Sequence, residues 1–242
     1  MNPTVSIIIR AMNEWCHLLE LLVAIKDQDY DGEKEIIVVD NESFDATPEF
    51  ARLNGARVVT IKKGEFTFPR SLNAGAETAR GEILVFLVGH ALPFEKDWLR
   101  FGLENFSDPR VASVYSPVIP RREHTLAETF YYWPRYLIAK MRGPYPINKV
   151  GVYCATNIAL RKNLWQQHHF DERYELGGED GEWAGWALSQ GHQIICDYRF
   201  SVRHSHELGA LGLWRQARYW GKLGKPTVFD QKELQFRKNL KF

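Results

Sequence analysis

Short runs of apolar and β-branched residues alternate with segments of helix length through the first half of the chain. Four such runs lie between residues 5 and 87, with the sequences VSIII, EIIVV, ARVVT and EILVFL. This alternation is typical of a parallel sheet that is covered by helices. The sequence therefore predicts an α/β fold built on a mostly parallel sheet.

One helix can be placed from its own spacing. Between Arg70 and Arg80, small or apolar residues recur at helical intervals, and Pro69 suits a first helical turn. We expect this helix to pack on the sheet. Ligands of such sheets bind beyond the carboxyl ends of the strands, so Asp40 and residues 88–90 lie where a nucleotide is expected.

After about residue 110 the regular alternation fades. The stretch from His124 to Lys149 is aromatic, basic and interrupted by proline, and it predicts a helix followed by a mobile loop. Regular elements resume with CATNIAL, GGEDGEWAGWALSQG and HQIICDYRF. From Ala210 the chain holds eight Lys or Arg against two Asp or Glu, interspersed with Trp and Phe, which indicates one or two amphipathic basic helices.

Composition restricts the class of protein. The chain has 242 residues, of which 45% are hydrophobic and 25% charged, enough for a sizeable core. Its net charge of +1 gives no overall attraction to nucleic acid. Three cysteines argue against a disulfide framework and for a reducing compartment. With no apolar run of about 18 residues, we expect a cytoplasmic protein without its own transmembrane anchor.

Three segments, VSIIIRAMNE, IIVVDNESFDAT and RSLNAGAETARGEILVFL, occur in an order and at a spacing similar to those of family-two glycosyltransferases. That family typically carries a PxYNE-like turn, a VVDxxSxD turn and an RxxNxGxxxAxGExxxFLDxD segment. The matching residues are Asn13, Glu14, Asp40, Asp45, Arg70, Asn73, Gly75, Gly81 and Glu82. Later segments, among them GGED and VRHSH, resemble bacterial rhamnosyltransferase-like members, so the resemblance covers about residues 4–207.

The resemblance implies the GT-A fold, with a nucleotide-binding half at about residues 1–110 and a smaller acceptor-binding half at 111–209, followed by the basic aromatic tail at 210–242. It implies a nucleoside diphosphate sugar as donor and a glycan or lipid-linked acceptor, in synthesis of a surface polysaccharide or similar glycan. The tail could contact the inner face of a membrane through its cations and Trp residues. A helix packed on the domain with a solvated outer face explains the same composition and is favoured.

The nucleotide site that the resemblance implies follows the first three strands. Asp40 would read the nucleobase, Arg70 would approach the base or the diphosphate, and the turn from Arg10 to Glu14 would line the pocket. The full set is Arg10, Asn13, Glu14, Asp40, Asn41, Arg70 and Asn73. Structural alternatives stay open: Asp40 fits an Asx turn, Asn73 a packing amide, and Glu14 a first-turn helix acid.

The chain departs from the family where two aspartates usually hold a cation against the donor diphosphate. Here the positions are Val88, Gly89 and His90. A diphosphate leaves only when its developing charge is neutralised. His90 could do so together with His204 and His206, which share a face if VRHSH is extended, either directly or through a Mn or Mg ion. Histidines at a strand end or on the surface are the alternative.

The GGED segment supplies the candidate base. Glu179 and Asp180 begin a predicted helix, where acids suit the helix dipole whether or not they act in catalysis. By resemblance, Asp180 removes the proton from the acceptor hydroxyl, and Glu179 binds the acceptor or orients a loop. Asn157 and Trp183 are further candidates for acceptor contact.

Three functions are compatible with these motifs. The favoured one is an inverting glycosyltransferase that uses a nucleotide sugar. A glycan- or nucleotide-binding pseudoenzyme would explain the missing aspartates, although the retained Glu179 and Asp180 argue against it. A nucleotidyltransferase usually needs a glycine-rich loop after its first strand, and IIIRAMNE has no glycine.

Overall fold

A computed structural model of the chain describes residues 2–150, 153–175 and 177–220. Its main sheet has eight strands in the order β3-β2-β1-β4-β8-β6-β9-β7. The strands are β1 Val5–Ala11, β2 Lys34–Asp40, β3 Arg57–Thr60, β4 Ile83–Val88, β6 Val111–Tyr115, β7 Tyr145–Ile147, β8 Asn157–Arg161 and β9 Gln193–Cys196. A two-stranded sheet pairs β5 (Leu92–Pro93) with β10 (Val202–Arg203).

The first four strands of the chain are parallel neighbours, as their apolar runs predict. Strand β8 then pairs antiparallel with both β4 and β6, and β7 pairs antiparallel with β9 at the edge. Parallel alignment brings the carboxyl ends of β1, β2 and β4 to one edge, where Ala11 lies beside Asp40 and Arg10 beside Val88. The loops that follow these strands therefore form one surface.

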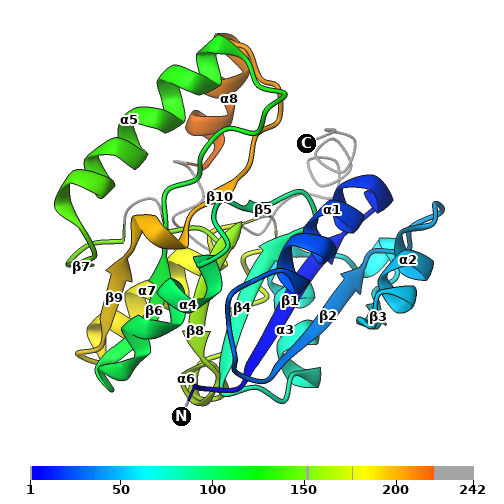
Figure 1. The fold of residues 1–242 in the computed structure, drawn as a ribbon, viewed down its shortest axis with the longest axis horizontal. Coiled ribbons are helices and arrows are strands. Elements are labelled where there is room, and N and C mark those ends of the chain that lie inside the picture. The colour runs from blue at the N-terminus through cyan, green and yellow to red at the C-terminus, as the bar shows by residue number, and fades with distance from the viewer. Residues whose placement is uncertain (1, 151–152, 176, 221–242) are drawn as a thin grey trace.

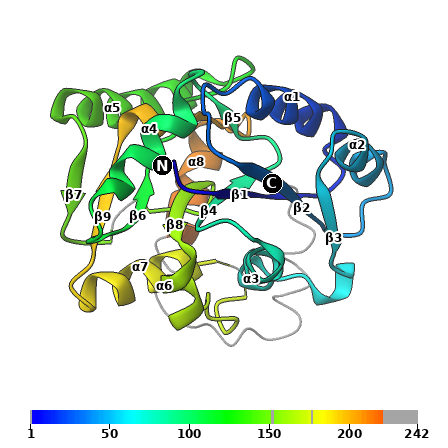
Figure 2. The ribbon, with the colours of Figure 1, turned by 60° about the horizontal axis from the view of Figure 1, so that its bottom comes forward.

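Helices cover both faces of the sheet (Figures 1 and 2). They are α1 Trp15–Lys26, α2 Thr47–Leu53, α3 Phe68–Thr78, α4 Trp98–Glu104, α5 Leu126–Arg142, α6 Lys162–Gln167, α7 Glu179–Ser189 and α8 Ala210–Trp220. Figure 2 shows α1 and α4 on one side of the strands and α3, α6 and α7 on the other. None of the described helices has the length and apolar character that a membrane-spanning helix needs.

The core consists of two layers because strand side chains alternate between the faces. Ile7 and Ile9 pack in the cluster that includes residues of α1 and α4, and Ile8 packs in the cluster that includes residues of α3 and α7. Helix α3 approaches β1 closely at Gly75, where an added Cβ would lie 2.3 Å from Ile8 Cγ2. The glycine is therefore needed for this helix-to-sheet contact.

One expectation for the second half needs correction. The predicted helix is present as α5, with Pro134 in its interior and its start fixed by a capping box between Thr125 and Glu128. The segment expected to be a mobile loop contains β7, because Tyr145–Ile147 pairs with the exposed edge of β9. The basic tail begins as helix α8, while residues 221–242 lie outside the described part of the chain. The division into nucleotide and acceptor halves stays a prediction.

Candidate functional site

Asp40 ends β2 at the carboxyl edge of the sheet and is buried. Its Oδ2 accepts a hydrogen bond from the backbone N–H of Ser43 at 3.1 Å, so the side chain does support a turn. Its Oδ1 is buried and has no hydrogen-bond partner within the described residues. A buried carboxylate oxygen without a donor is costly, and a ligand N–H or O–H would satisfy it.

The loop after β1 is joined to the loop after β2 by short polar contacts. Asn13 accepts from the Phe44 N–H at 2.9 Å and donates its own backbone N–H to Ser43 Oγ at 2.9 Å. Asn13 adopts a positive φ of 55°, which asparagine tolerates better than most residues. Asn41 Nδ2 lies 3.4 Å from Met12 Sδ, and Asn41 Oδ1 is buried without a described partner.

Arg10 is a half-buried cation whose charge reaches the acidic residues of α7. Its guanidinium lies over the Phe68 ring at 4.9 Å, and its Nε and Nη1 have no hydrogen-bond acceptor in the described part of the chain. Its charge acts to lower the pKa of both Glu179 and Asp180. Arg10 therefore offers free donors to an anion near these carboxyls.

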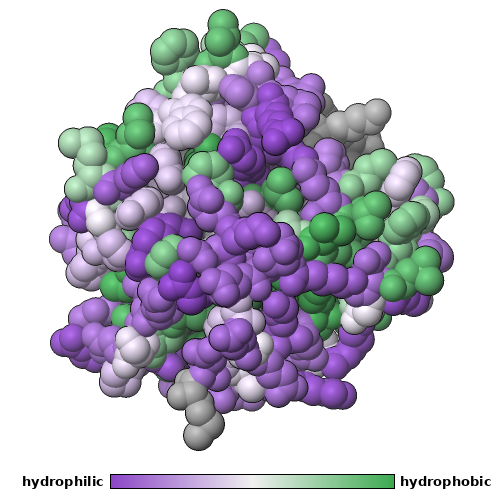
Figure 3. Space-filling model, viewed as in Figure 1, coloured by the Kyte–Doolittle hydropathy of each residue, from purple (hydrophilic) through white to green (hydrophobic). Residues whose placement is uncertain are grey.

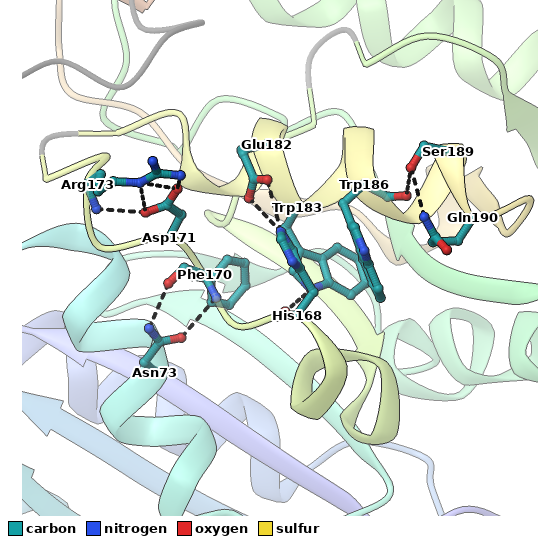
Figure 4. A network of polar contacts seen from close by, with 10 residues as sticks. All are labelled: Asn73, His168, Phe170, Asp171, Arg173, Glu182, Trp183, Trp186, Ser189 and Gln190. Carbon is teal, nitrogen blue, oxygen red and sulfur yellow. Dashed lines mark hydrogen bonds and ion pairs between the residues drawn. The ribbon is translucent and has the colours of Figure 1, made fainter.

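Arg70 and Asn73 lie on α3 and line a pocket of about 420 Å³ beside β3. The Arg70 guanidinium forms an exposed ion pair with Glu65 at 2.8 Å. Asn73 is buried and bonded within the protein: its Oδ1 accepts from Trp165 Nε1 and the Phe170 N–H, each at 3.1 Å, and its Nδ2 donates to the Phe170 carbonyl at 2.8 Å (Figure 4). This geometry is that of a packing amide, and its nucleotide role stays a prediction.

Glu179 and Asp180 begin α7 directly after Gly178, whose φ of 103° turns the chain into the helix. Asp180 accepts from the backbone N–H of Ala155 at 2.9 Å and from its neighbour Gly181 at 2.7 Å. Glu179 is buried, and its Oε2 has no partner within the described segments. The two acids are thus held differently: Asp180 accepts from the N–H groups of Ala155 and Gly181, whereas one carboxyl oxygen of Glu179 has no partner among the described residues.

The pKa values of this pair are both raised, chiefly by burial. The pKa of Glu179 rises to about 8 because burial and the charge of Asp180 disfavour its ionised form. Burial also raises the pKa of Asp180, but the N–H groups of Ala155 and Gly181 oppose that rise. Near neutral pH we expect Glu179 to hold a proton beside the Asp180 carboxyl.

Three histidines converge at the end of β4 from segments far apart in sequence. His90 Nε2 lies 3.1 Å from His204 Nε2, and the His204 and His206 rings have centroids 4.6 Å apart. One ligand nitrogen from each of the three lies within 4.8 Å of the others, a spacing that a single metal ion could bridge. The structure thus brings together the residues that sequence placed here.

Glu14 orients this cluster. Its Oε1 lies 2.7 Å from His90 Nδ1, a contact that favours the tautomer with the proton on Nδ1 and fixes the ring with Nε2 directed toward His204. Gly89 makes room for the contact, because a Cβ there would lie 2.2 Å from Glu14 Oε2. Val88 precedes it and packs on the apolar core.

The electrostatics of the cluster favour neutral imidazoles. Burial and the neighbouring His90 lower the pKa of His204 well below 6.5 and that of His206 to about 4.

Arg121 donates to the carbonyl of His90 at 2.9 Å and pairs with Glu20 at 2.6 Å, adding a fixed positive charge. With Glu14, His90 and His206 it lines a pocket of about 270 Å³. Sequence reasoning missed Arg121, whose only signal is a basic pair after a strand.

The two residues predicted to contact an acceptor lie inside the protein. Trp183 is fully buried and donates its indole N–H to the His168 carbonyl at 2.8 Å. Asn157 is also buried; its Nδ2 donates to Ser116 Oγ at 2.9 Å and to the Phe200 carbonyl. Asn157 Oδ1 has no partner in the described part of the chain, and the contact roles of both residues stay predictions.

Comparison with known sequences places the chain among sugar transferases. Residues 6–168 match the family model described as Glycosyl transferase family 2. The chain is 29% identical to glycosyltransferase AglE of Haloferax volcanii, over 80% of this chain and 66% of that protein. It is 24% identical to the O-antigen chain rhamnosyltransferase RfbN of Salmonella typhimurium, over 96% of this chain and 81% of that protein.

Solved structures share the fold. A mannosyltransferase from Pyrobaculum calidifontis, in complex with GDP-Man and Mn2+, matches 90% of this chain and 61% of its own, with TM-score 0.68 and 23% identity. Glucosyl-3-phosphoglycerate synthase from Mycobacterium tuberculosis, with Mn2+, UDP and glucosyl-3-phosphoglycerate, matches 93% of this chain and 82% of its own, with TM-score 0.65 and 19% identity. The fold is therefore the GT-A fold, and the chain belongs to glycosyl transferase family 2.

Proposed function

We propose that the protein transfers a sugar from a nucleoside diphosphate to an acceptor hydroxyl, with inversion at the anomeric carbon, in the synthesis of a surface polysaccharide or similar glycan. The observation that carries this proposal is the buried acid pair that begins α7, in which Asp180 is held by two backbone donors beside a carboxyl that retains its proton. The similarity to RfbN, an O-antigen chain rhamnosyltransferase, supports a role in glycan synthesis.

Asp180 acts as the general base in this proposal. As the acceptor oxygen attacks the anomeric carbon, the bond from that carbon to the diphosphate breaks, and the hydroxyl proton passes to the Asp180 carboxylate. A single displacement of this kind inverts the anomeric configuration. Glu179 stays protonated near neutral pH because burial and Asp180 raise its pKa to about 8, so it can donate a hydrogen bond to the acceptor.

The donor is held by the polar atoms that the fold leaves without partners. Asp40 Oδ1 would accept from the base, and Asn41 Oδ1 would accept from the base or ribose. The Nε and Nη1 donors of Arg10 would bind the phosphates or the sugar. Arg70, which shares its pocket with Glu65, would approach the base from α3.

The histidine cluster fits a divalent metal, which would neutralise charge on the departing diphosphate. His204 and His206 are neutral at pH 7, as metal binding requires, and Glu14 supplies the carboxylate that orients the His90 ring. Imidazole suits Mn²⁺ and softer ions better than Mg²⁺, which prefers oxygen. Both structural relatives described above contain Mn2+.

The proposed acceptor is a glycan or lipid-linked hydroxyl, and the proposed location is the cytoplasm. A glycan or lipid-linked hydroxyl would reach Asp180 from the side of the 111–209 half. Cys16, Cys154 and Cys196 are free thiols, which fits the reducing cytoplasm. Donor and acceptor therefore meet on the cytoplasmic side in this proposal.

The direct experiment supplies the protein with a panel of nucleotide sugars, with and without EDTA. Turnover is measured as the release of nucleoside diphosphate. Turnover of at least one donor, lost on chelation and restored by Mn²⁺ or Zn²⁺, is the expected result. Binding of nucleotides without any turnover would indicate a binding pseudoenzyme. Release of a sugar 1-phosphate in place of the nucleoside diphosphate would indicate attack at the α-phosphate, which is the chemistry of a nucleotidyltransferase.

A further inference from the structure

Helix α5 has two apolar faces, and only one of them packs on the protein. Its buried residues are Glu128, Tyr132, Tyr136 and Ala139. The opposite side carries a row of large apolar side chains between 50% and 87% exposed, here called the α5 apolar stripe, which consists of Leu126, Phe130, Leu137 and Met141. At about 100° per residue, these four lie within roughly 60° of one another on the helix.

Within the described residues, the exposed charges on helices α5 and α8 are all positive. The one acidic residue of α5, Glu128, is buried, whereas Arg135, Lys140 and Arg142 are exposed. The neighbouring helix α8 has no acidic residue and adds exposed Arg215 and Arg218, together with the exposed apolar side chains Leu211 and Trp214. Large apolar side chains flanked by cations, with no exposed anions on the same helices, match the interface of an anionic membrane.

The stripe lies at an outer border of the molecule. In Figure 1, α5 and α8 are adjacent and stand away from the main sheet, and Figure 3 shows hydrophobic surface along the border where α5 runs. The buried side of α5 is bonded to the histidine segment: Glu128 accepts from the His206 backbone N–H at 2.9 Å, and Thr125 Oγ1 donates to the Leu208 carbonyl at 2.6 Å. A surface that binds α5 would therefore lie close to the histidine-lined pocket.

We propose that α5 binds the surface of an anionic membrane, with the α5 apolar stripe inserted at the level of the acyl chains and Lys140, which lies beside the stripe on the helix, at the phosphates. Long basic side chains can reach headgroups while their stems cover apolar surface. A second copy of the chain fits this face less well, because a twofold contact through it would bring the same cations together from both sides. The proposal does not depend on the catalytic role or on residues 221–242.

The test is flotation of the full chain with vesicles of phosphatidylcholine alone or with phosphatidylglycerol added. The stripe variant is Phe130→Ser with Met141→Ser, and the control is Val23→Ser with Leu53→Ser, two exposed apolar residues on α1 and α2. Both variants remove only exposed side chains, so both should fold, which far-UV circular dichroism and melting would check. Lys140→Glu tests the charge contribution.

We expect binding to vesicles that contain phosphatidylglycerol, weakened about tenfold or more in the stripe variant, reduced in Lys140→Glu and unchanged in the control. The stripe variant keeps the basic tail, so the loss would be assigned to α5. Equal binding of the stripe variant and the wild type would overturn the proposal. The proposal would also be overturned if the wild type did not bind vesicles but formed a dimer in sedimentation experiments, and the stripe variant did not form that dimer.

Discussion

Substitution of Asn73 tests whether this residue holds the site together or contacts the ligand. In Asn73→Ala, the Trp165 indole N–H and the backbone N–H and carbonyl of Phe170 all lose their partner inside the protein. Each buried group left unsatisfied costs about 1–3 kcal/mol, and partial entry of water reduces the sum. We expect the free energy of unfolding to fall by about 3–5 kcal/mol, a large part of the stability of an ordinary domain.

The measurement is urea unfolding followed by tryptophan fluorescence, with thermal melting in parallel. A loss of this size lowers the melting temperature by about 10 °C in a domain of this length. The control is Asn54→Ala, a partly exposed amide that bonds its own helix at Phe50, for which we expect a loss below about 1 kcal/mol. Unchanged stability in Asn73→Ala, together with weaker nucleotide binding, would refute the assignment of Asn73 as a packing residue.

Three further substitutions test separate parts of the account. The pKa of Glu179 is raised from 4.5 to about 8, so its stabilising contribution is present below pH 4.5 and is lost as the pH rises through about 8. The melting temperature of the wild type should therefore fall over that range of pH, and Glu179→Gln should flatten this fall. Gly75→Ala should destabilise by about 1–3 kcal/mol in urea unfolding, whereas Gly64→Ala, with open space around it, should not. Glu14→Gln should weaken Mn²⁺ or Zn²⁺ binding about 10- to 100-fold in calorimetry, and unchanged affinity would contradict its orienting role.

The first half of the fold could be predicted from the sequence because local pattern and tertiary structure agree there. The four apolar runs are long enough to be recognised as buried strands, and Pro69 marks the start of α3. The second half could not be predicted in the same way. Strand β7 has only three residues and forms because β9 offers an unpaired edge, while α5 tolerates Pro134 in its interior.

The acid pair could be placed at the start of α7 because GGED is a local signal for a helix start, although the Ala155 N–H that holds Asp180 comes from 25 residues away in the sequence. The histidine cluster was anticipated as a set of residues, but its orientation by Glu14 depends on a contact across 76 positions of sequence. The burial of Trp183 and Asn157, in contrast, could not be predicted from the sequence. Their residue types are compatible with sugar binding, yet only packing decides that both are buried.

The measurement that tests the central claim most directly is the turnover number of Asp180→Asn with a donor that the wild type uses, with nucleoside diphosphate binding measured in parallel. Loss of a general base should lower turnover by about 10²- to 10⁴-fold, while binding changes less than about threefold. Asp171→Asn, in the loop before α7, is the control and should retain activity. Full turnover by Asp180→Asn would contradict the account, because the account assigns the general base to Asp180 alone.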